Sequence, residues 1–203
     1  GEQTLLHASG GISWTWSTNE TTQSIYVSPT VNTTYSVTAS NGNCTAKTAY
    51  IQVVRPKPDI QISGNSICIG NTTTLSAING NSYIWNTTST ANTISVSPSE
   101  NTTYTVTGTG TNGCKNTAEI EINVYALPVV TLTDTAICSG HTATLDAGSH
   151  SAYLWKDAQQ NTIGTSATIS VTAANTYYVT VTNTNNCSAT ANATLSVHPP
   201  ITL

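Results

Sequence analysis

The residues of this sequence with the clearest chemical potential are its five cysteines: Cys44, Cys68, Cys114, Cys138 and Cys187. A chain of 203 residues with this many cysteines, four of them at matching places in a repeated pattern, is typical of a disulfide framework in a secreted or cell-surface protein. The chemistry that we expect from them is therefore cross-linking of the fold.

The other reactive side chains form no catalytic or metal-binding pattern. The four histidines stand at unrelated places and lack metal-ligand spacing: His7, His141, His150 and His198. Glu119 and Glu121 alternate with isoleucines, as on a half-exposed strand, and no serine lies in the glycine elbow of a hydrolase. We expect a protein that is not an enzyme and that uses no cofactor or metal.

Composition narrows the class of protein further. Charged residues make up 7% of the chain and the net charge is -4, so no basic surface is available for nucleic acid or anionic lipid. Apolar residues alternate with polar ones and never approach a run of 20, which argues against a membrane span in this fragment. Abundant Thr, with no Phe or Met, favours extended strands and an all-β fold.

A single pattern recurs three times along the chain. Its landmarks in the second copy are Tyr83-Ile84-Trp85, Thr93–Val96, Thr103–Val106 and Asn112-Gly113-Cys114. Trp85 follows Trp16 by 69 residues, and Trp155 follows Trp85 by 70. The period indicates a tandem array of small domains, each with its own core.

The repeats divide the chain at 1–55, 56–126 and 127–198, and residues 199–203 match the start of a fourth. Repeat 1 begins where Gly70 stands in repeat 2, so we expect it to lack its first strand and the chain to be cut from a longer array. Repeat 3 is five residues longer than repeat 2 after its tryptophan, which predicts a longer hairpin loop at Lys156–Gln160.

The recurring aromatic residues fall on inward strand positions and are expected to form the cores: Trp16, Trp85, Trp155, Tyr35, Tyr104 and Tyr177. Two residues before the core tryptophan, repeat 1 has Trp14 where repeats 2 and 3 have Tyr83 and Tyr153. A platform of these side chains for sugar rings is an alternative to simple packing.

The whole pattern resembles the Ig-like and PKD-like repeats of large Bacteroidetes-type secreted or cell-surface proteins. The residues that carry the resemblance are Cys-x-Gly, Thr-Leu-x-Ala, Tyr-x-Trp, Thr-Tyr-x-Val and Asn-Gly-Cys, and they span nearly the entire chain. The resemblance implies small Ig-like β-sandwiches of six or seven strands each, with Tyr104 as the corner tyrosine. It specifies the fold far better than any activity.

Two disulfide arrangements stay open. Pairing within each repeat, Cys68 with Cys114 and Cys138 with Cys187, closes every repeat by itself and is our first choice. Cys44 then pairs outside this fragment, two residues before Gly1. In a seven-strand Ig topology, however, the two cysteines of one repeat lie about 20 Å or more apart, too far for a disulfide. A six-strand unit removes this objection. So does a bridge between neighbours, Cys68 to Cys187, with Cys138 pairing beyond Leu203.

We expect a non-catalytic spacer, stalk or fibre segment of a large secreted or cell-surface adhesin-like protein. Its partners would be the neighbouring repeats of the same long chain, and glycans or a protein receptor, the latter at the Lys156–Gln160 loop. One alternative is a carbohydrate-binding accessory module of a secreted polysaccharide-degrading enzyme. Another is a subunit of an extracellular filament, in which the Ile201–Leu203 strand completes the first repeat of a neighbour.

Overall fold

The computed structural model describes residues 3–200, and every regular element in that range is a β-strand. Two compact units are distinguished: one runs to Pro58 and includes Thr109–Asn116, and the other comprises Asp59–Gly108 and the residues from Thr117 onward. The expectations that concern Gly1 and the Ile201–Leu203 strand lie outside the described residues.

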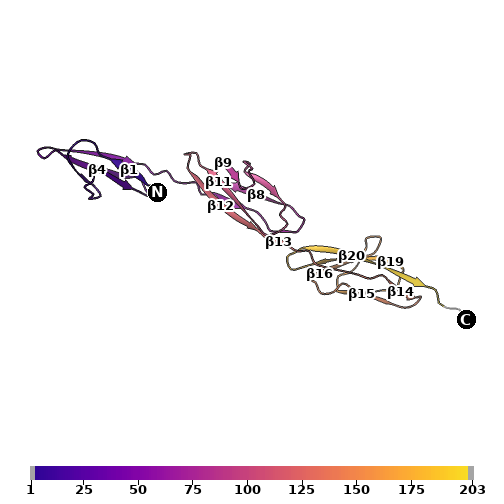
Figure 1. Ribbon diagram of the computed structural model, residues 1–203. Helices are drawn as coiled ribbons and strands as arrows, with labels where there is room; N and C mark the ends of the chain where they lie inside the picture. Colours follow the sequence, from indigo (N-terminus) through magenta and orange to yellow (C-terminus); the bar gives the residue numbers. More distant parts are fainter. Residues whose placement is uncertain (1–2, 201–203) are drawn as a thin grey trace. The chain divides into compact units, whose positions relative to one another are not determined.

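Repeat 1 contains five strands, arranged in two small sheets (Figure 1). They are β1 (Thr4–His7), β2 (Ser13–Trp16), β3 (Ser24–Val27), β4 (Thr33–Ser40) and β5 (Thr45–Gln52). β1 pairs with β3, and β2, β4 and β5 form the second sheet with β5 at its edge. β4 and β5 are antiparallel from Thr33↔Gln52 to Ser40↔Thr45.

Repeat 2 is a sandwich whose first and last strands are each broken in two. Its strands are β6 (Gln61–Ser63), β7 (Ile67–Cys68), β8 (Thr73–Ile78), β9 (Ser82–Trp85), β10 (Thr93–Val96), β11 (Thr102–Thr109), β12 (Lys115–Ile122) and β13 (Val124–Tyr125). One sheet has the order β10-β8-β6 and the other β12-β11-β9. β7 then crosses to pair in parallel with β13.

Repeat 3 has one five-stranded and one two-stranded sheet. Its strands are β14 (Thr135–Cys138), β15 (Ala143–Asp146), β16 (Ala152–Lys156), β17 (Thr162–Gly164), β18 (Thr168–Val171), β19 (Asn175–Thr182) and β20 (Ser188–His198). The order in the larger sheet is β14-β20-β19-β16-β17, and β15 pairs with β18. The insertion at Lys156–Gln160 therefore leads into an additional edge strand, β17, instead of only lengthening a loop.

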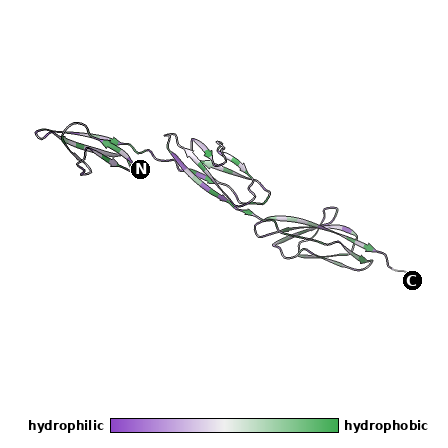
Figure 2. Ribbon diagram, in the orientation of Figure 1, coloured by the Kyte–Doolittle hydropathy of each residue, from purple (hydrophilic) through white to green (hydrophobic). Residues whose placement is uncertain are grey.

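Three hydrophobic clusters hold these sheets together, and each draws its residues from a single repeat. The inward positions alternate with polar outward ones, so green and pale or purple residues follow one another along the strands in Figure 2. The central tryptophans Trp16, Trp85 and Trp155 are all buried. The chain is an all-β tandem of Ig-like sandwiches.

Candidate functional site: a disulfide-linked junction

The register of the first and last strands decides which cysteines can meet. β7 runs parallel to β13, with Cys68 directly opposite Tyr125. Cys114 lies at the other end of that last strand, eleven residues before Tyr125. An extended chain of that length spans about 36 Å, while the Cα atoms of a disulfide lie within about 7 Å of each other. Cys68 and Cys114 cannot pair.

Repeat 3 has the same arrangement. Cys138 on β14 is opposite His198 on β20, and Cys187 precedes β20 by one residue. Eleven residues again separate the two ends of the last strand. The within-repeat pairing of Cys138 with Cys187 is therefore prevented by the same strand geometry.

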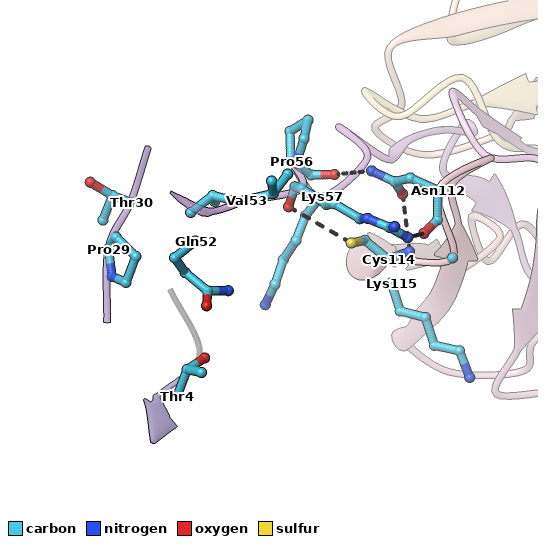
Figure 3. Close-up of a pocket in the computed structure, with 13 residues that line it drawn as sticks. Thr4, Pro29, Thr30, Gln52, Val53, Pro56, Lys57, Asn112, Cys114 and Lys115 are labelled. Carbon is cyan, nitrogen blue, oxygen red and sulfur yellow. Dashed lines mark hydrogen bonds between the residues drawn. The ribbon is translucent and has the colours of Figure 1, made fainter. Parts of the chain in front are cut away.

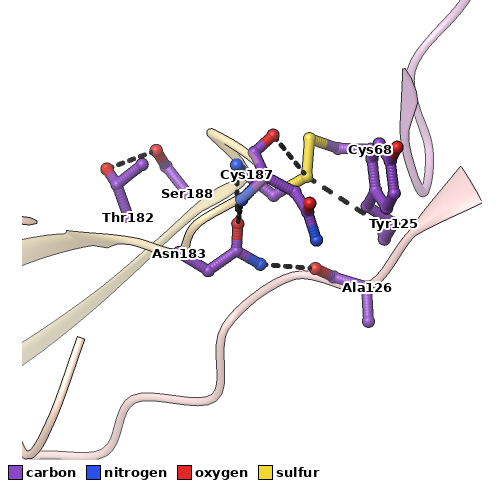
Figure 4. Close-up of a disulfide and its surroundings, with 8 residues drawn as sticks. Cys68, Tyr125, Ala126, Thr182, Asn183, Cys187 and Ser188 are labelled. Atoms are coloured by element: carbon purple, nitrogen blue, oxygen red, sulfur yellow. Dashed lines mark hydrogen bonds between the residues drawn. A yellow bond between two sulfur atoms is a disulfide. The ribbon is translucent and has the colours of Figure 1, made fainter. Parts of the chain in front are cut away.

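Cys68 is bonded instead to Cys187 of the following repeat (Figure 4). The two Cα atoms are 5.6 Å apart, and 119 residues separate the cysteines in sequence. The first-choice prediction of within-repeat disulfides was wrong, and the alternative bridge between neighbours is the one that forms. Cys44, Cys114 and Cys138 are free thiols in the described part of the chain.

The disulfide belongs to a junction built largely from backbone groups. The Ile67 amide donates to the Asn123 carbonyl at 3.0 Å, and the Ile69 amide to the Tyr125 carbonyl at 2.9 Å. These bonds fix Cys68 beside Tyr125, whose carbonyl oxygen lies 4.0 Å from Cys187 Sγ. The end of repeat 2 and the hairpin of repeat 3 are thereby held together.

Asn183 supplies the side-chain part of this junction. Its Nδ2 donates to the Ala126 carbonyl at 3.0 Å, and its Oδ1 accepts the Cys187 amide at 3.0 Å (Figure 4). One amide group thus connects the chain that leaves repeat 2 to the hairpin that carries the cysteine. Because the described junction contains these direct bonds as well as the disulfide, its geometry is specified by more than one cross-link.

An asparagine precedes the hairpin cysteine in every repeat, a feature that the sequence reasoning missed. Asn41 Oδ1 accepts the Cys44 amide at 2.8 Å, and Asn112 Oδ1 accepts the Cys114 amide at 3.0 Å. The sequence signal is Asn-Gly-Cys and its variants. In repeat 2 this motif ends a five-residue loop, Gly110 to Cys114.

The Cys-x-Gly motif has a conformational cause. Gly70 and Gly140 adopt φ values of 86° and 85°, in the left-handed region that glycine accommodates without strain. The turn that they form is closed by an amide that donates to the cysteine carbonyl, from Asn71 to Cys68 and from His141 to Cys138. The motif therefore directs the chain from the cysteine strand into the next strand.

The recurring aromatics are engaged inside their own repeats. The indole N–H groups of Trp16, Trp85 and Trp155 donate at 2.8 Å to the backbone carbonyls that lie two residues before β3, β10 and β18, respectively. Tyr35, Tyr104 and Tyr177 are buried, and burial raises the pKa of the Tyr177 hydroxyl.

The aromatics considered for sugar binding also have internal partners. Trp14 Nε1 donates to the Gly10 carbonyl at 2.9 Å, and the hydroxyls of Tyr83 and Tyr153 donate to the carbonyls of Gly80 and Gly148. In each case the polar tip of the ring closes the preceding turn. All three side chains are half-buried.

The described chain holds no cluster of metal-ligating side chains. No group of three His, Cys, Asp or Glu residues that could hold a metal ion occurs between residues 3 and 200. Hydrogen bonds from Asn161 lower the pKa of the exposed Asp157 carboxyl, and they order the turn that follows β16. Between residues 3 and 200 no helix is long and apolar enough to cross a membrane.

Among the three repeats, repeat 3 matches a known protein family. Residues 126–199 match the family model described as Ig-like domain, CHU_C associated. No curated protein matches the chain. Residues 126–199 contain the whole of repeat 3, so the family match and the observed strand pairing describe the same unit.

Several solved structures of Ig domains are similar at low sequence identity. Extracellular domains 3–5 of Drosophila OTK have a TM-score of 0.40 at 12% identity, covering 98% of this chain and 92% of that one. The insect immune protein hemolin has a TM-score of 0.35 at 12% identity, covering 98% and 72%. The family match supports the resemblance to Ig-like repeats for residues 126–199, and the observed sheets make the chain an all-β tandem of Ig-like sandwiches.

Proposed function

We propose that the chain is a non-catalytic spacer, stalk or fibre segment of a large secreted or cell-surface protein. The observation that carries this proposal is the disulfide from Cys68 to Cys187, which joins two consecutive sandwiches and closes neither of them. Ig-like domains of this kind are typically structural or adhesion modules. A covalent bond between modules strengthens the link between consecutive domains of the array.

The junction limits independent motion of repeats 2 and 3. Two parallel backbone bonds hold Cys68 on the last strand of repeat 2, and the disulfide and Asn183 then hold the hairpin of repeat 3. Interfaces between consecutive domains usually permit relative motion unless they are large and apolar. Here a covalent bond takes the place of a large interface, which is the property that a spacer needs.

A disulfide of this kind also fits an extracellular or cell-surface protein, because structural disulfides persist in oxidising compartments. Chain-entropy theory assigns about 5 kcal/mol to closure of a loop of roughly 119 residues. That contribution is comparable to the total stability of a small domain. The linked pair is therefore suited to conditions in which a single small sandwich unfolds.

The proposal is tested by measuring the relative motion of repeats 2 and 3 by NMR relaxation. In the oxidised chain both repeats should tumble with one correlation time. In the Cys68→Ser/Cys187→Ser variant each repeat should keep its own fold and tumble more independently. The matched control is Cys44→Ser/Cys138→Ser, which alters two free thiols. Equal tumbling with and without the disulfide would contradict a spacer role for this junction.

A protein-binding role is favoured by one specific feature, the β16–β17 hairpin of repeat 3. Asp157 Oδ1 accepts the Asn161 amide at 2.8 Å and Oδ2 accepts Asn161 Nδ2 at 2.9 Å, so the exposed turn is well ordered. Repeats 1 and 2 have no such strand in the described residues. Deleting residues 157–161 should preserve the fold; loss of binding to a receptor in a cell-surface pull-down would assign the hairpin to recognition.

A further inference from the structure

The inward face of β5 in repeat 1 is uncovered. Tyr50 occupies the position of Ile120 in repeat 2 and Ala193 in repeat 3, counted from the hairpin cysteine. Ala193 is fully buried and Ile120 is half-buried, but Tyr50 is 57% exposed. Repeat 1 therefore leaves open a part of its last strand that repeats 2 and 3 cover.

Repeat 2 shows what that element is. The segment from β6 to β7 passes over the last strand there, and a Cβ on Gly64 would lie 3.4 Å from Ile122 and 3.7 Å from Ile120. β6 pairs with β8, and β7 pairs in parallel with β13. In repeat 1 the corresponding edges, β1 and the residues after β5, have no such partner in the described chain.

Gln52 gives independent evidence for a missing strand. It stands where repeats 2 and 3 have the buried core residues Ile122 and Leu195. Its Oε1 is buried and has no hydrogen-bond partner among the described residues. A buried acceptor without a donor is destabilising, and an incoming backbone N–H would satisfy it.

Cys114 lies in a copy of the junction that holds Cys187 (Figure 3). Asn112 Nδ2 donates to the Pro56 carbonyl at 2.8 Å, as Asn183 does to Ala126. The Cys114 thiol donates to the Arg55 carbonyl at 3.7 Å. Arg55 follows Cys44 by eleven residues, the same interval that separates Tyr125 from Cys114. The hairpin of repeat 2 thus forms its side of the junction, but no strand in the described chain places a second cysteine next to Cys114.

The space next to Cys114 is an open groove of about 940 Å³. Gln52 and the edge residues Val53 and Val54 line one part of it, and Cys114 lines another (Figure 3). Thr4, at the start of β1, also lies on its wall. The unpaired edge after β5, the Gln52 side chain and the Cys114 thiol therefore all line the same groove.

We propose that this groove accepts an extended polypeptide strand of the form Ile-Cys-x-Gly, which pairs in parallel with residues 52–55 and forms a disulfide with Cys114. The occupant is the segment that would directly precede Gly1 in an array. Both β7 and β14 have this sequence, as Ile67-Cys68-Ile69-Gly70 and Ile137-Cys138-Ser139-Gly140. This proposal deepens the proposed spacer function, because it extends the same linkage to the preceding junction.

The bond forms by thiol–disulfide exchange with a low-molecular-weight disulfide such as oxidised glutathione. The strand cysteine and Cys114 together lose two electrons and two protons as their sulfur–sulfur bond forms. The disulfide of the oxidant breaks, takes up the two electrons and leaves as two thiols carrying those protons.

A second copy of the chain is a less suitable donor. The cysteine strand β14 of any copy is already paired with its own β20, from Thr135↔Leu195 to Cys138↔His198. It would have to leave that sheet before it could enter the groove of another molecule. A segment that is unpaired until it docks meets no such obstacle.

The test adds the ten residues Ile60 to Ile69 as a second copy directly before Gly1 of the full chain, which places a cysteine two residues before Gly1. After oxidation with glutathione, peptide mapping should find the added cysteine bonded to Cys114. The melting temperature of repeat 1 should rise by about 4 to 8 °C or more. A matched extension with serine in place of the cysteine should protect the amides near Gln52 from exchange without forming the bond.

Three results would overturn the proposal. The added cysteine could pair with Cys44, at the opposite end of β5, or stay reduced under conditions that keep Cys68–Cys187 oxidised. Without the extension, the chain could form oligomers in which residues 200–203 of one copy protect β5 of another. Each of these leaves the bond between repeats 2 and 3 intact, so the proposed spacer function is judged separately by the relaxation experiment.

Discussion

Pulling the chain from its two ends should release much less length when Cys68 and Cys187 are bonded than when they are not. The disulfide connects two points that are 119 residues apart in sequence and whose Cα atoms are 5.6 Å apart. Force applied at the ends therefore passes through the sulfur–sulfur bond. The residues between the cysteines, which include most of repeats 2 and 3, do not extend even if they unfold.

The expected difference follows from chain geometry. An extended polypeptide spans at most about 3.3 to 3.6 Å per residue, so the shielded segment corresponds to about 400 Å of contour length. Optical tweezers or atomic force microscopy resolve a difference of this size readily. Reduction of the wild-type chain, or the Cys68→Ser/Cys187→Ser double variant, should add that length to the full extension.

The comparison includes its own control. Cys44→Ser/Cys138→Ser removes two free thiols and should leave the released length at the oxidised value. If the oxidised wild-type chain and the double variant release the same contour length, the bond between neighbours is absent in solution. The same result would remove the basis for the proposed spacer, since that proposal depends on a covalent connection between sandwiches.

Three further predictions concern the cores and one exposed turn. Trp85→Ala should lower the free energy of unfolding of repeat 2 by about 3 to 5 kcal/mol, as measured by denaturant titration. The control variant Ile84→Ala changes an exposed residue of the same strand and should lower this free energy far less. Gln52→Leu should raise the stability of the isolated chain by about 1 kcal/mol or more, because it removes a buried acceptor without a partner; no gain would mean that the acceptor is solvated. The lowered pKa of Asp157 means that its stabilising effect is present above the usual carboxyl pKa and is lost as pH falls through the lowered value. Asn161→Ala should bring the Asp157 pKa, followed by NMR, back toward its usual range.

The repeat pattern predicted the cores well, because burial of a mid-strand tryptophan depends on alternation within one strand. Trp16, Trp85 and Trp155 recur at nearly constant intervals, and each is buried with its indole N–H bonded to a nearby carbonyl. Such local periodicity is fully contained in the sequence.

The cysteine pairing could not be obtained in this way. Repeat equivalence shows that Cys68 and Cys114 occupy the same places as Cys138 and Cys187, but it does not show on which end of a sandwich each place lies. That depends on the parallel pairing of β7 with β13, a contact between segments far apart in sequence. The Ig resemblance pointed to this difficulty, and the strand register resolves it in favour of neighbours.

Placing the two cysteines of a repeat at opposite ends of its last strand has a consequence for the whole array. Neither cysteine can close its own sandwich, so each is directed toward an adjacent repeat. Cys68 and Cys187 satisfy this rule within the described chain, and Cys114 lies in an equivalent half-junction. In such an array the strength of a junction does not depend on the apolar area that two small sandwiches bury against each other. Surface residues of the repeats can then vary while the connection persists, because it requires only Cys-x-Gly, the hairpin asparagine and the register of the last strand.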